Sequence, residues 1–330
     1  MNEKAGRKRL ILDLDTGIDD ALALAYALGS PEVELVGVIC SYGNVTMRTA
    51  VRNTVALLEL LGHPEVPVLT GADRALAAAE AFAPPTGVTL IHGENGLGNQ
   101  RVSGLCRCAP GDGLTFLRAE AQRAAEKNEE LLYVPTGPLT NLAHALGSIP
   151  GLADALGRVT FMGGALAVPG NVTPCAEANV ANDPAAADAV LRGGLRTRMI
   201  GLDVTHQAVL TREDTAAWRE LDTPPGRFFA DMTDHYIAIY EQNNPQMGGC
   251  ALHDPLAVAA ALDPALVGCF AANLRVDLEG PTRGRTVCDP DRLRVPQKTC
   301  EVALTVDVPR FLGEFRARVG RALLDTPDNG

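Results

Sequence analysis

The sequence lacks the features that mark several classes of protein. Among its 330 residues, 29 Lys and Arg stand against 40 Asp and Glu, which gives a net charge of −11. Binding to nucleic-acid phosphates requires clustered positive charge, so we expect no nucleic-acid partner. The apolar runs, such as residues 21–28, end well short of the roughly 18 residues that a membrane span needs. We therefore expect a protein that does not bind membranes.

Cysteines are also too few to form a disulfide scaffold. The chain has eight, and only Cys106 and Cys108 lie close together in sequence, so we interpret them as reduced thiols. Residues 1–9 are charged and lead directly into the apolar run 10–12, without the long apolar core or small-residue cleavage site of a secretion signal. These observations predict a cytoplasmic protein.

Short apolar runs alternate with longer helical segments along the chain. The runs show little polar alternation, which is typical of parallel strands covered on both faces. We expect strands at residues 9–13, 34–39, 131–134, 158–162 and 198–202, and helices at 19–28, 48–61, 114–127, 139–146 and 184–192. This order predicts one α/β domain over residues 1–330, with its core at about 9–325 and a mostly parallel, Rossmann-like central sheet flanked by helices.

Turn-rich segments separate these elements. Residues 70–92, 163–171 and 242–249 are rich in Gly, Pro and Asn, so we expect loops there, the first and third as candidate lids. Residues 222–262 are expected to form two helices around the Asn-rich break. We interpret residues 271–308 as strands of an appended subregion.

The segment LILDLDTGIDDALAL carries four carboxylates within eight residues: Asp13, Asp15, Asp19 and Asp20. In an open parallel sheet, ligands bind beyond the carboxyl ends of the strands, where this motif lies. An ordinary explanation is that Asp19 and Asp20 favour the helix dipole while Asp13 is a solvated strand end. It leaves the mutual repulsion unexplained, because clustered like charges are unfavourable without a cation. Oxygen ligands without a Cys/His cluster favour Ca²⁺ or Mg²⁺ over zinc.

Polar side chains follow several other apolar runs. Each alone has an ordinary interpretation as a turn residue, a helix cap or a surface histidine. Their repeated position after strands favours a single crevice that collects them. These residues are Asn44, Thr136, Asn141, Asn171, Glu177, Asn179, His253 and Asp254.

These segments together resemble the calcium-dependent nucleoside hydrolases of the inosine–uridine-preferring type. The resemblance extends from about residue 9 to 325 and rests on DxDxxxDD at residues 13–20, then VPTGPLTN, FMGG, the GN at 170–171, GLDVTH and HDP, in the family's order. It implies the nucleoside hydrolase fold and hydrolysis of the N-glycosidic bond of ribonucleosides, such as inosine and uridine, to base and ribose. It also implies a role in nucleoside salvage and assembly into a homodimer or homotetramer.

The resemblance further implies a role for each matching residue. One Ca²⁺ would be held by Asp15, Asp20, the Thr136 carbonyl and Asp254, an oxygen shell that suits this ion. Asp15 would deprotonate the metal-held attacking water, and His253 would protonate the leaving base. The implied substrate contacts are Asp19, Asn44 and Asn179 at the 2′ and 3′ hydroxyls, Asn171 and Glu177 at the 5′ hydroxyl with Met162 nearby, and His92, Tyr236 and Tyr240 around the base. Such a site is expected to reject 2′-deoxynucleosides.

Base preference follows less directly from the sequence. The single tryptophan, Trp218, lies outside the matched pocket segments, which argues against the subgroup that stacks purines between tryptophans and favours the broad inosine and uridine group. Tyr236 and Tyr240 have an alternative interpretation as core residues one helical turn apart. Ala178, Leu166 and Ala167 depart from the family pattern near the 5′ end of the pocket. The histidines interpreted as structural are His63, His144 and His206, although His206 lies in GLDVTH.

Two other functions account for parts of the sequence. A haloacid-dehalogenase-like phosphohydrolase also has a DxD after a strand, as in Asp13 and Asp15. That chemistry needs a lysine after a later strand, which none of the four lysines provides, and Gly17 stands where a hydroxyl residue is expected. A calcium-dependent ribonucleoside-binding protein without turnover is the second alternative, and release of free ribose distinguishes it from an enzyme.

Overall fold

The first strand lies inside a four-stranded parallel sheet. The computed structural model describes residues 7–102 and 111–324, so Cys106 and Cys108 lie outside the described residues. In β1 (Lys8–Leu14) all residues after Lys8 are buried. Strand β1 pairs in parallel with β2 (Val33–Cys40) and β4 (Leu131–Pro135), and β2 pairs with β3 (Val68–Thr70), in the order β3-β2-β1-β4.

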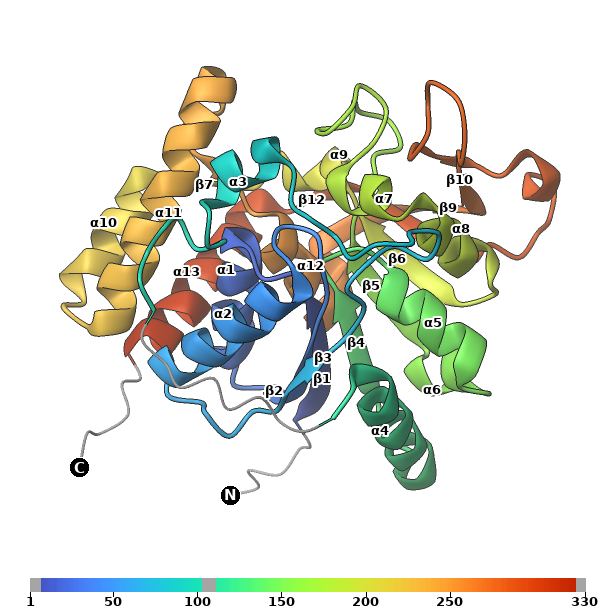
Figure 1. Cartoon of the computed structure of the whole chain (residues 1–330), viewed down its shortest axis with the longest axis horizontal. Coiled ribbons are helices and arrows are strands. Elements are labelled where there is room, and N and C mark those ends of the chain that lie inside the picture. The colour runs from blue at the N-terminus through green and yellow to red at the C-terminus, as the bar shows by residue number, and fades with distance from the viewer. Residues whose placement is uncertain (1–6, 103–110, 325–330) are drawn as a thin grey trace.

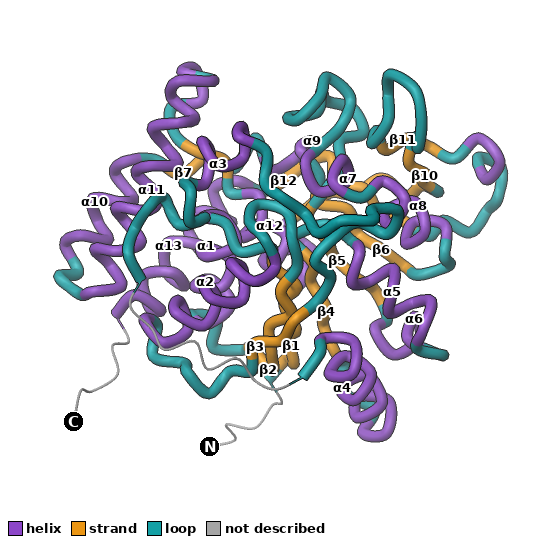
Figure 2. The backbone as a smooth tube through the Cα atoms, viewed as in Figure 1, coloured by secondary structure: helices purple, strands orange, loops and turns teal. Residues whose placement is uncertain are grey.

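A second four-stranded sheet continues from the first. Its order is β5 (Arg158–Met162), β6 (Arg196–Ile200), β12 (Cys300–Val306) and β9 (Val267–Ala272), and only β9 runs antiparallel to its neighbour. Strands β4 and β5 lie side by side (Figure 2), so the carboxyl ends of the parallel strands in both sheets face the same crevice. The architecture is therefore mixed α/β with a mostly parallel central sheet, as the sequence predicts.

Helices cover the two faces of these sheets and form two hydrophobic cores. One core contains residues of α1 (Ile18–Leu28), α2 (Met47–Leu60), α12 (His253–Leu262) and α13 (Val308–Leu324). The other contains residues of α4 (Gly113–Lys127), α5 (Thr140–Ser148), α6 (Leu152–Leu156) and α8 (Pro184–Arg192). No helix in the described ranges has the length and apolar character needed to cross a bilayer.

Shorter elements complete the crevice side of the molecule. Helix α11 (Pro224–Asn243) packs against α10 (Arg212–Glu220) and contacts α3 (Thr86–His92). Helices α7 (Ala178–Asn182) and α9 (Leu202–Thr205) follow the ends of β5 and β6 in sequence. The remaining strands form two small antiparallel pairs, β7 (Val209–Leu210) with β8 (Cys250–Ala251) and β10 (Leu274–Val276) with β11 (Thr286–Cys288). Short 3₁₀ helices lie at Pro245–Met247, Pro264–Leu266 and Pro290–Arg292.

Local sequence signals explain where several helices begin. The Asp112 side chain accepts a hydrogen bond from the Thr115 amide at the start of α4, and Asp183 caps α8, whose first residue is Pro184. These are the preferred cap and first-turn residues. Thr46 caps α2 in the same manner by accepting from the Thr49 amide.

The five predicted strands and five predicted helices are present, with ends that shift by a few residues. The expectation of two helices around the Asn-rich break is also confirmed, by α11 and α12. The loop predicted at residues 70–92 contains α3, so that prediction is wrong in part. Residues 271–308 are no appended subregion, because β12 lies inside the second sheet between β6 and β9. Helices α10 and α13 are additions that the sequence analysis does not predict.

Helix α13 packs on α1 and so helps to hold the helix that begins at the crevice (Figure 1). Its Phe311 and Phe315 are fully buried, with ring centroids 6.4 and 6.3 Å from that of Tyr26 in α1. Arg318 lies over the same tyrosine ring, 5.0 Å from its centroid. The position of α1, and with it the acidic motif, therefore depends on a helix almost 300 residues further along the chain.

We expect Phe315→Ala to lower the free energy of unfolding by about 3–5 kcal/mol, because it removes a buried aromatic ring and leaves a cavity. Gly313→Ala on the same helix is the matched control. Its added methyl group meets no atom within 4 Å, so it should raise stability by about 0.5–1 kcal/mol. Urea denaturation measures both, and a Phe315→Ala protein as stable as the unsubstituted one would contradict this packing role.

Candidate functional site

A cavity of about 450 Å³ opens where the strands end, within the usual size range of small-molecule sites. Its walls come from the ends of β4 and β5, the starts of α1 and α12, and helices α3, α7 and α11. The structure brings twelve predicted site residues to this wall: Asp19, Asn44, His92, Thr136, Met162, Asn171, Glu177, Asn179, Tyr236, Tyr240, His253 and Asp254. The other two, Asp15 and Asp20, are buried beside it.

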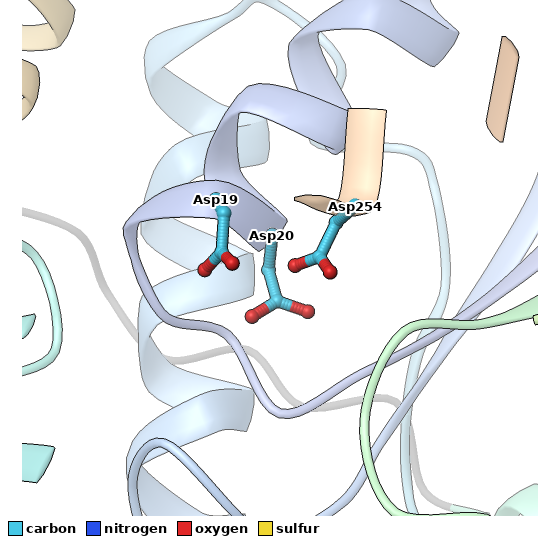
Figure 3. A group of neighbouring side chains, drawn as sticks. All are labelled: Asp19, Asp20 and Asp254. Carbon is cyan, nitrogen blue, oxygen red and sulfur yellow. The ribbon is translucent and has the colours of Figure 1, made fainter. Parts of the chain in front are cut away.

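Three buried carboxylates form an acid cluster at the base of the cavity. Asp19 and Asp20 come from the first turn of α1 and Asp254 from the first turn of α12, and one oxygen of each lies within 4.8 Å of the others (Figure 3). Asp20 accepts hydrogen bonds from the Thr136 hydroxyl at 2.7 Å and the Gly17 amide at 2.8 Å. The partial positive charge at two helix N-termini favours carboxylates at this position.

Asp15 lies next to the acid cluster and shares a hydrogen-bond donor with it, because the Asn44 side chain also donates to Asp20 Oδ2 at 3.1 Å. The Asn44 amide donates to Asp15 Oδ2 at 2.7 Å, and the Asn44 side chain donates to Asp15 Oδ1 at 3.2 Å. Gly43 makes this approach possible, because a Cβ there would lie 1.9 Å from Asp15 Oδ2. The geometry thus groups Asp19, to which the resemblance gives a ribose contact, with Asp20 and Asp254, while Asn44 links Asp15 to this group.

The electrostatics of the cluster indicate missing positive charge. Burial and neighbouring carboxylates raise the pKa of Asp15 and Asp254 well above the ordinary range, and raise that of Asp19 to about 8. Asp19 Oδ1 and Asp254 Oδ2 are buried without a hydrogen-bond partner in the described structure. Such orphaned oxygens are costly unless a cation pairs with them. The acid cluster has the donor set and the unmet charge of a metal site.

Asp13 belongs to a separate unit. It is 1% exposed, accepts hydrogen bonds from the Tyr133 hydroxyl and, at 2.8 Å, from the Asn141 side chain, and burial raises its pKa to about 7. The interpretation of Asp13 as a solvated strand end is therefore wrong. Asn141 also accepts from the Ala72 amide at 2.7 Å. It ties the loop after β3 to the end of β1 instead of lining the cavity.

The opposite wall of the cavity is built around Glu177. This buried carboxylate caps α7 and accepts from the amides of Gly164 at 2.8 Å and Asn179 at 2.8 Å. The Asn179 side chain donates to the Thr136 carbonyl at 2.6 Å. Asn171 accepts a hydrogen bond from the Ala178 amide at 3.0 Å. This contact uses only the backbone of residue 178, so it does not depend on the side chain that departs from the family pattern there.

Five rings form a continuous ring arc along the cavity: His92, Tyr236, Tyr240, His253 and His206. Successive ring centroids are 5.5, 5.0, 6.5 and 5.6 Å apart. Tyr236 and Tyr240 line the cavity and do not serve only as core packing. His206, which the sequence analysis interprets as structural, also lines the cavity.

The two buried histidines of the arc are neutral. His253 Nδ1 lies 2.7 Å from the Thr205 hydroxyl and its Nε2 lies 2.7 Å from the Tyr240 hydroxyl. His92 Nδ1 accepts from the Ile18 amide at 3.2 Å. Burial, with smaller effects of nearby histidines, lowers the pKa of each to about 3. Both ring nitrogens of His253 are thus hydrogen-bonded within the protein, by Thr205 and Tyr240.

The cavity also has apolar lining that the sequence analysis missed. Apolar residues of α3, of α11, of a loop and of a 3₁₀ helix contribute to it, together with the polar Asn243 and Asn244, and the apolar positions of α3 are a signal that could have revealed part of it. Trp218 is 4% exposed and packs on Phe315 with ring centroids 6.3 Å apart, away from the cavity as expected. The missed residues include Val88, Ile91, Val172, Ile239, Asn243, Asn244 and Met247.

Comparison with known proteins places this geometry in a family context. The family model described as inosine-uridine preferring nucleoside hydrolase matches residues 10–313. The inosine-uridine preferring nucleoside hydrolase of Crithidia fasciculata is 34% identical and covers 93% of this chain and 95% of its own. The pyrimidine-specific ribonucleoside hydrolase RihA of Klebsiella pneumoniae subsp. pneumoniae is 34% identical, with 94% and 97% covered. The structure of a purine-preferring ribonucleoside hydrolase from Gardnerella vaginalis is 49% identical with a TM-score of 0.93, covering 97% and 100%.

In metal-free protein we expect the melting temperature to fall as the pH rises from about 5 to 8. The folded-state pKa values of Asp19 and Asp13 are about 8 and about 7, against 3.8 ordinarily. Across this window the folded state retains protons that the unfolded state has released, so raising the pH removes stability. Calorimetry in excess EDTA should show a decrease of roughly 5 °C or more.

The same scan with excess calcium chloride is the control. A bound cation compensates the ionised cluster, so the decrease should be smaller. A metal-free melting temperature that stays constant or rises over this pH range would show that the buried carboxylates are not held protonated.

Proposed function

The chain belongs to the inosine-uridine preferring nucleoside hydrolase family and hydrolyses the N-glycosidic bond of ribonucleosides, and we propose that it does so with one calcium ion and accepts both inosine and uridine. One observation carries the proposal: buried carboxylates with two orphaned oxygens lie at the base of a ligand-sized cavity. A binding protein without turnover would not need Asp15, a carboxylate that can accept a proton from water, beside these oxygens.

Calcium suits the oxygen donors at this position. We propose Asp15, Asp20, Asp254 and the Thr136 carbonyl as its ligands, with Asp254 Oδ2 orphaned in the absence of a cation. The Thr136 carbonyl accepts one hydrogen bond from Asn179 and keeps a second lone pair. About six to eight oxygens surround calcium in proteins, which leaves positions for water and ribose hydroxyls. When bound, the ion supplies positive charge that orients the hydroxyls and makes a water easier to deprotonate.

Asp15 is the proposed base that takes the proton of the attacking water. Asn44 holds both of its oxygens and fixes the direction in which the carboxylate faces. Asp19, Asn44 and Asn179 are proposed to bind the 2′ and 3′ hydroxyls, while Asn171 and Glu177 bind the 5′ hydroxyl near Met162. Bond rupture leaves positive charge on the ribose, which nearby carboxylates stabilise.

The leaving base is proposed to receive its proton through the chain Tyr240–His253–Thr205. Its three polar groups are joined at 2.7 Å in each step. The Tyr240 hydroxyl contacts the base, and His253 holds and resupplies the proton behind it. His92 and Tyr236 complete the base pocket, since both line the cavity.

Acceptance of two base classes is supported by the pocket composition and by the relatives. Their names specify inosine and uridine, pyrimidines, or purines, so closely related frameworks serve both classes. The described cavity wall contains no tryptophan that would favour purine stacking. Assembly into a homodimer or homotetramer, a cytoplasmic location and a role in nucleoside salvage form part of the same proposal.

The central test is release of free ribose from inosine and uridine. We expect Asp15→Asn to lower kcat by about 10²–10⁴-fold, because the amide cannot accept the water proton. The matched control is Asp222→Asn, at a carboxylate with a side chain 92% exposed, which should retain full activity. EDTA should abolish ribose release and calcium should restore it. If the unsubstituted protein with calcium releases ribose from no ribonucleoside, the proposal fails.

Substrate analogues test the hydroxyl contacts independently of any mutation. We expect 2′-deoxyinosine to be hydrolysed at least about 10⁴-fold less efficiently than inosine, since its binding leaves buried polar groups of the site unpaired. Comparison of kcat/KM for the two nucleosides measures this. Similar values would contradict the placement of Asp19, Asn44 and Asn179 at the ribose hydroxyls.

A further inference from the structure

We propose that His206 is a specificity-determining residue whose imidazole hydrogen-bonds the leaving nucleobase. The inference rests on the proposed function and adds a contact that the motif comparison does not assign. His206 directly follows α9, beyond the carboxyl end of β6, and lines the same cavity as the acid cluster. It ends the ring arc at the side opposite His92.

The free ring nitrogens of the arc favour His206 as a ligand contact. Both nitrogens of His253 are bonded within the protein, and one nitrogen of His92 is bonded to the Ile18 amide. Within residues 7–102 and 111–324, no group is hydrogen-bonded to the His206 ring. Its ring lies edge-on to His253 at 5.6 Å. Of the three histidines of the arc, only His206 thus has neither ring nitrogen hydrogen-bonded within the described residues.

The backbone under His206 is held firmly, although its ring is free. The two oxygens of Asp203 accept from the amides of Leu166 at 2.9 Å and Ala167 at 2.7 Å. Asp203 is therefore occupied and forms no hydrogen bond with the His206 ring. Thr205 is bonded to His253. A contact residue on such a fixed support needs little reorganisation when a ligand binds.

The chemistry of a neutral imidazole explains how one contact can serve two base classes. Burial lowers the pKa of His206, so near neutral pH the ring carries one N–H donor and one acceptor nitrogen. Exchange of tautomers interchanges the two. Purine and pyrimidine bases both present ring nitrogens and carbonyl or amino groups, and a side chain that can either donate or accept can pair with each.

The test compares leaving groups that do and do not need this contact. In p-nitrophenyl β-D-ribofuranoside the ribose is unchanged, but the leaving group departs as a stable anion without the hydrogen-bonding edge of a base. We expect His206→Ala to lower kcat/KM for inosine and uridine by roughly 10- to 100-fold, with the nitrophenyl riboside changed less than about threefold. His206→Gln, which keeps a donor and an acceptor, should restore part of the loss.

The control is His63→Ala, at an exposed histidine paired with Glu65, which should match the unsubstituted enzyme on all three substrates. Equal losses on the nucleosides and the nitrophenyl riboside would overturn the proposal, because they would show a structural role. No loss on either, or a Gln variant as impaired as the Ala variant, would also overturn it. Failure of the unsubstituted enzyme on inosine and uridine would instead reject the proposed function.

Discussion

Mutual repulsion among buried carboxylates is the constraint around which the crevice is built. Burial and neighbouring carboxylates raise the pKa of Asp15, Asp19 and Asp254, and Asp20 contributes to the increase at all three. Hydrogen bonds from the ends of neighbouring strands hold the group together: Asn44 follows β2 and Thr136 follows β4. Since α12 brings Asp254 from far along the chain, the sheet and both helix N-termini must be in place before the charges converge.

Much of the fold could be predicted because its signals are local. The strands β1, β2, β4, β5 and β6 are apolar runs, and each is recognisable without knowledge of its neighbours. Strand β9 is different: it is also an apolar run, VGCFAA, but four consecutive residues of it are exposed at the edge of the sheet, and it runs antiparallel to β12. The position of β12 between β6 and β9 depends on how distant segments pair, and no local sequence pattern predicts that order.

The sequence predicted which residues lie at the candidate site better than it predicted the contacts that each of them makes. Twelve of the expected residues line one cavity because strand ends meet at one edge. The hydrogen-bond partners of the individual side chains depend on tertiary neighbours, which the sequence does not show. Asp13 and Asp15 are two residues apart, yet one is bonded to Tyr133 and Asn141 and the other to Asn44. The neutrality of His253 comes from burial, and the exposure of His206 to the cavity comes from the path of α9.

The place of β12 in the sheet has a consequence for synthesis of the protein. Until Cys300–Val306 has left the ribosome, β6 has an open edge and β9 has no partner. Helix α13, which supports α1, follows later still. A nascent chain that already contains every proposed active-site residue is therefore still incompletely folded. Unpaired strand edges can pair with other chains, so neighbouring nascent chains on one messenger RNA are exposed to aggregation until β12 has emerged.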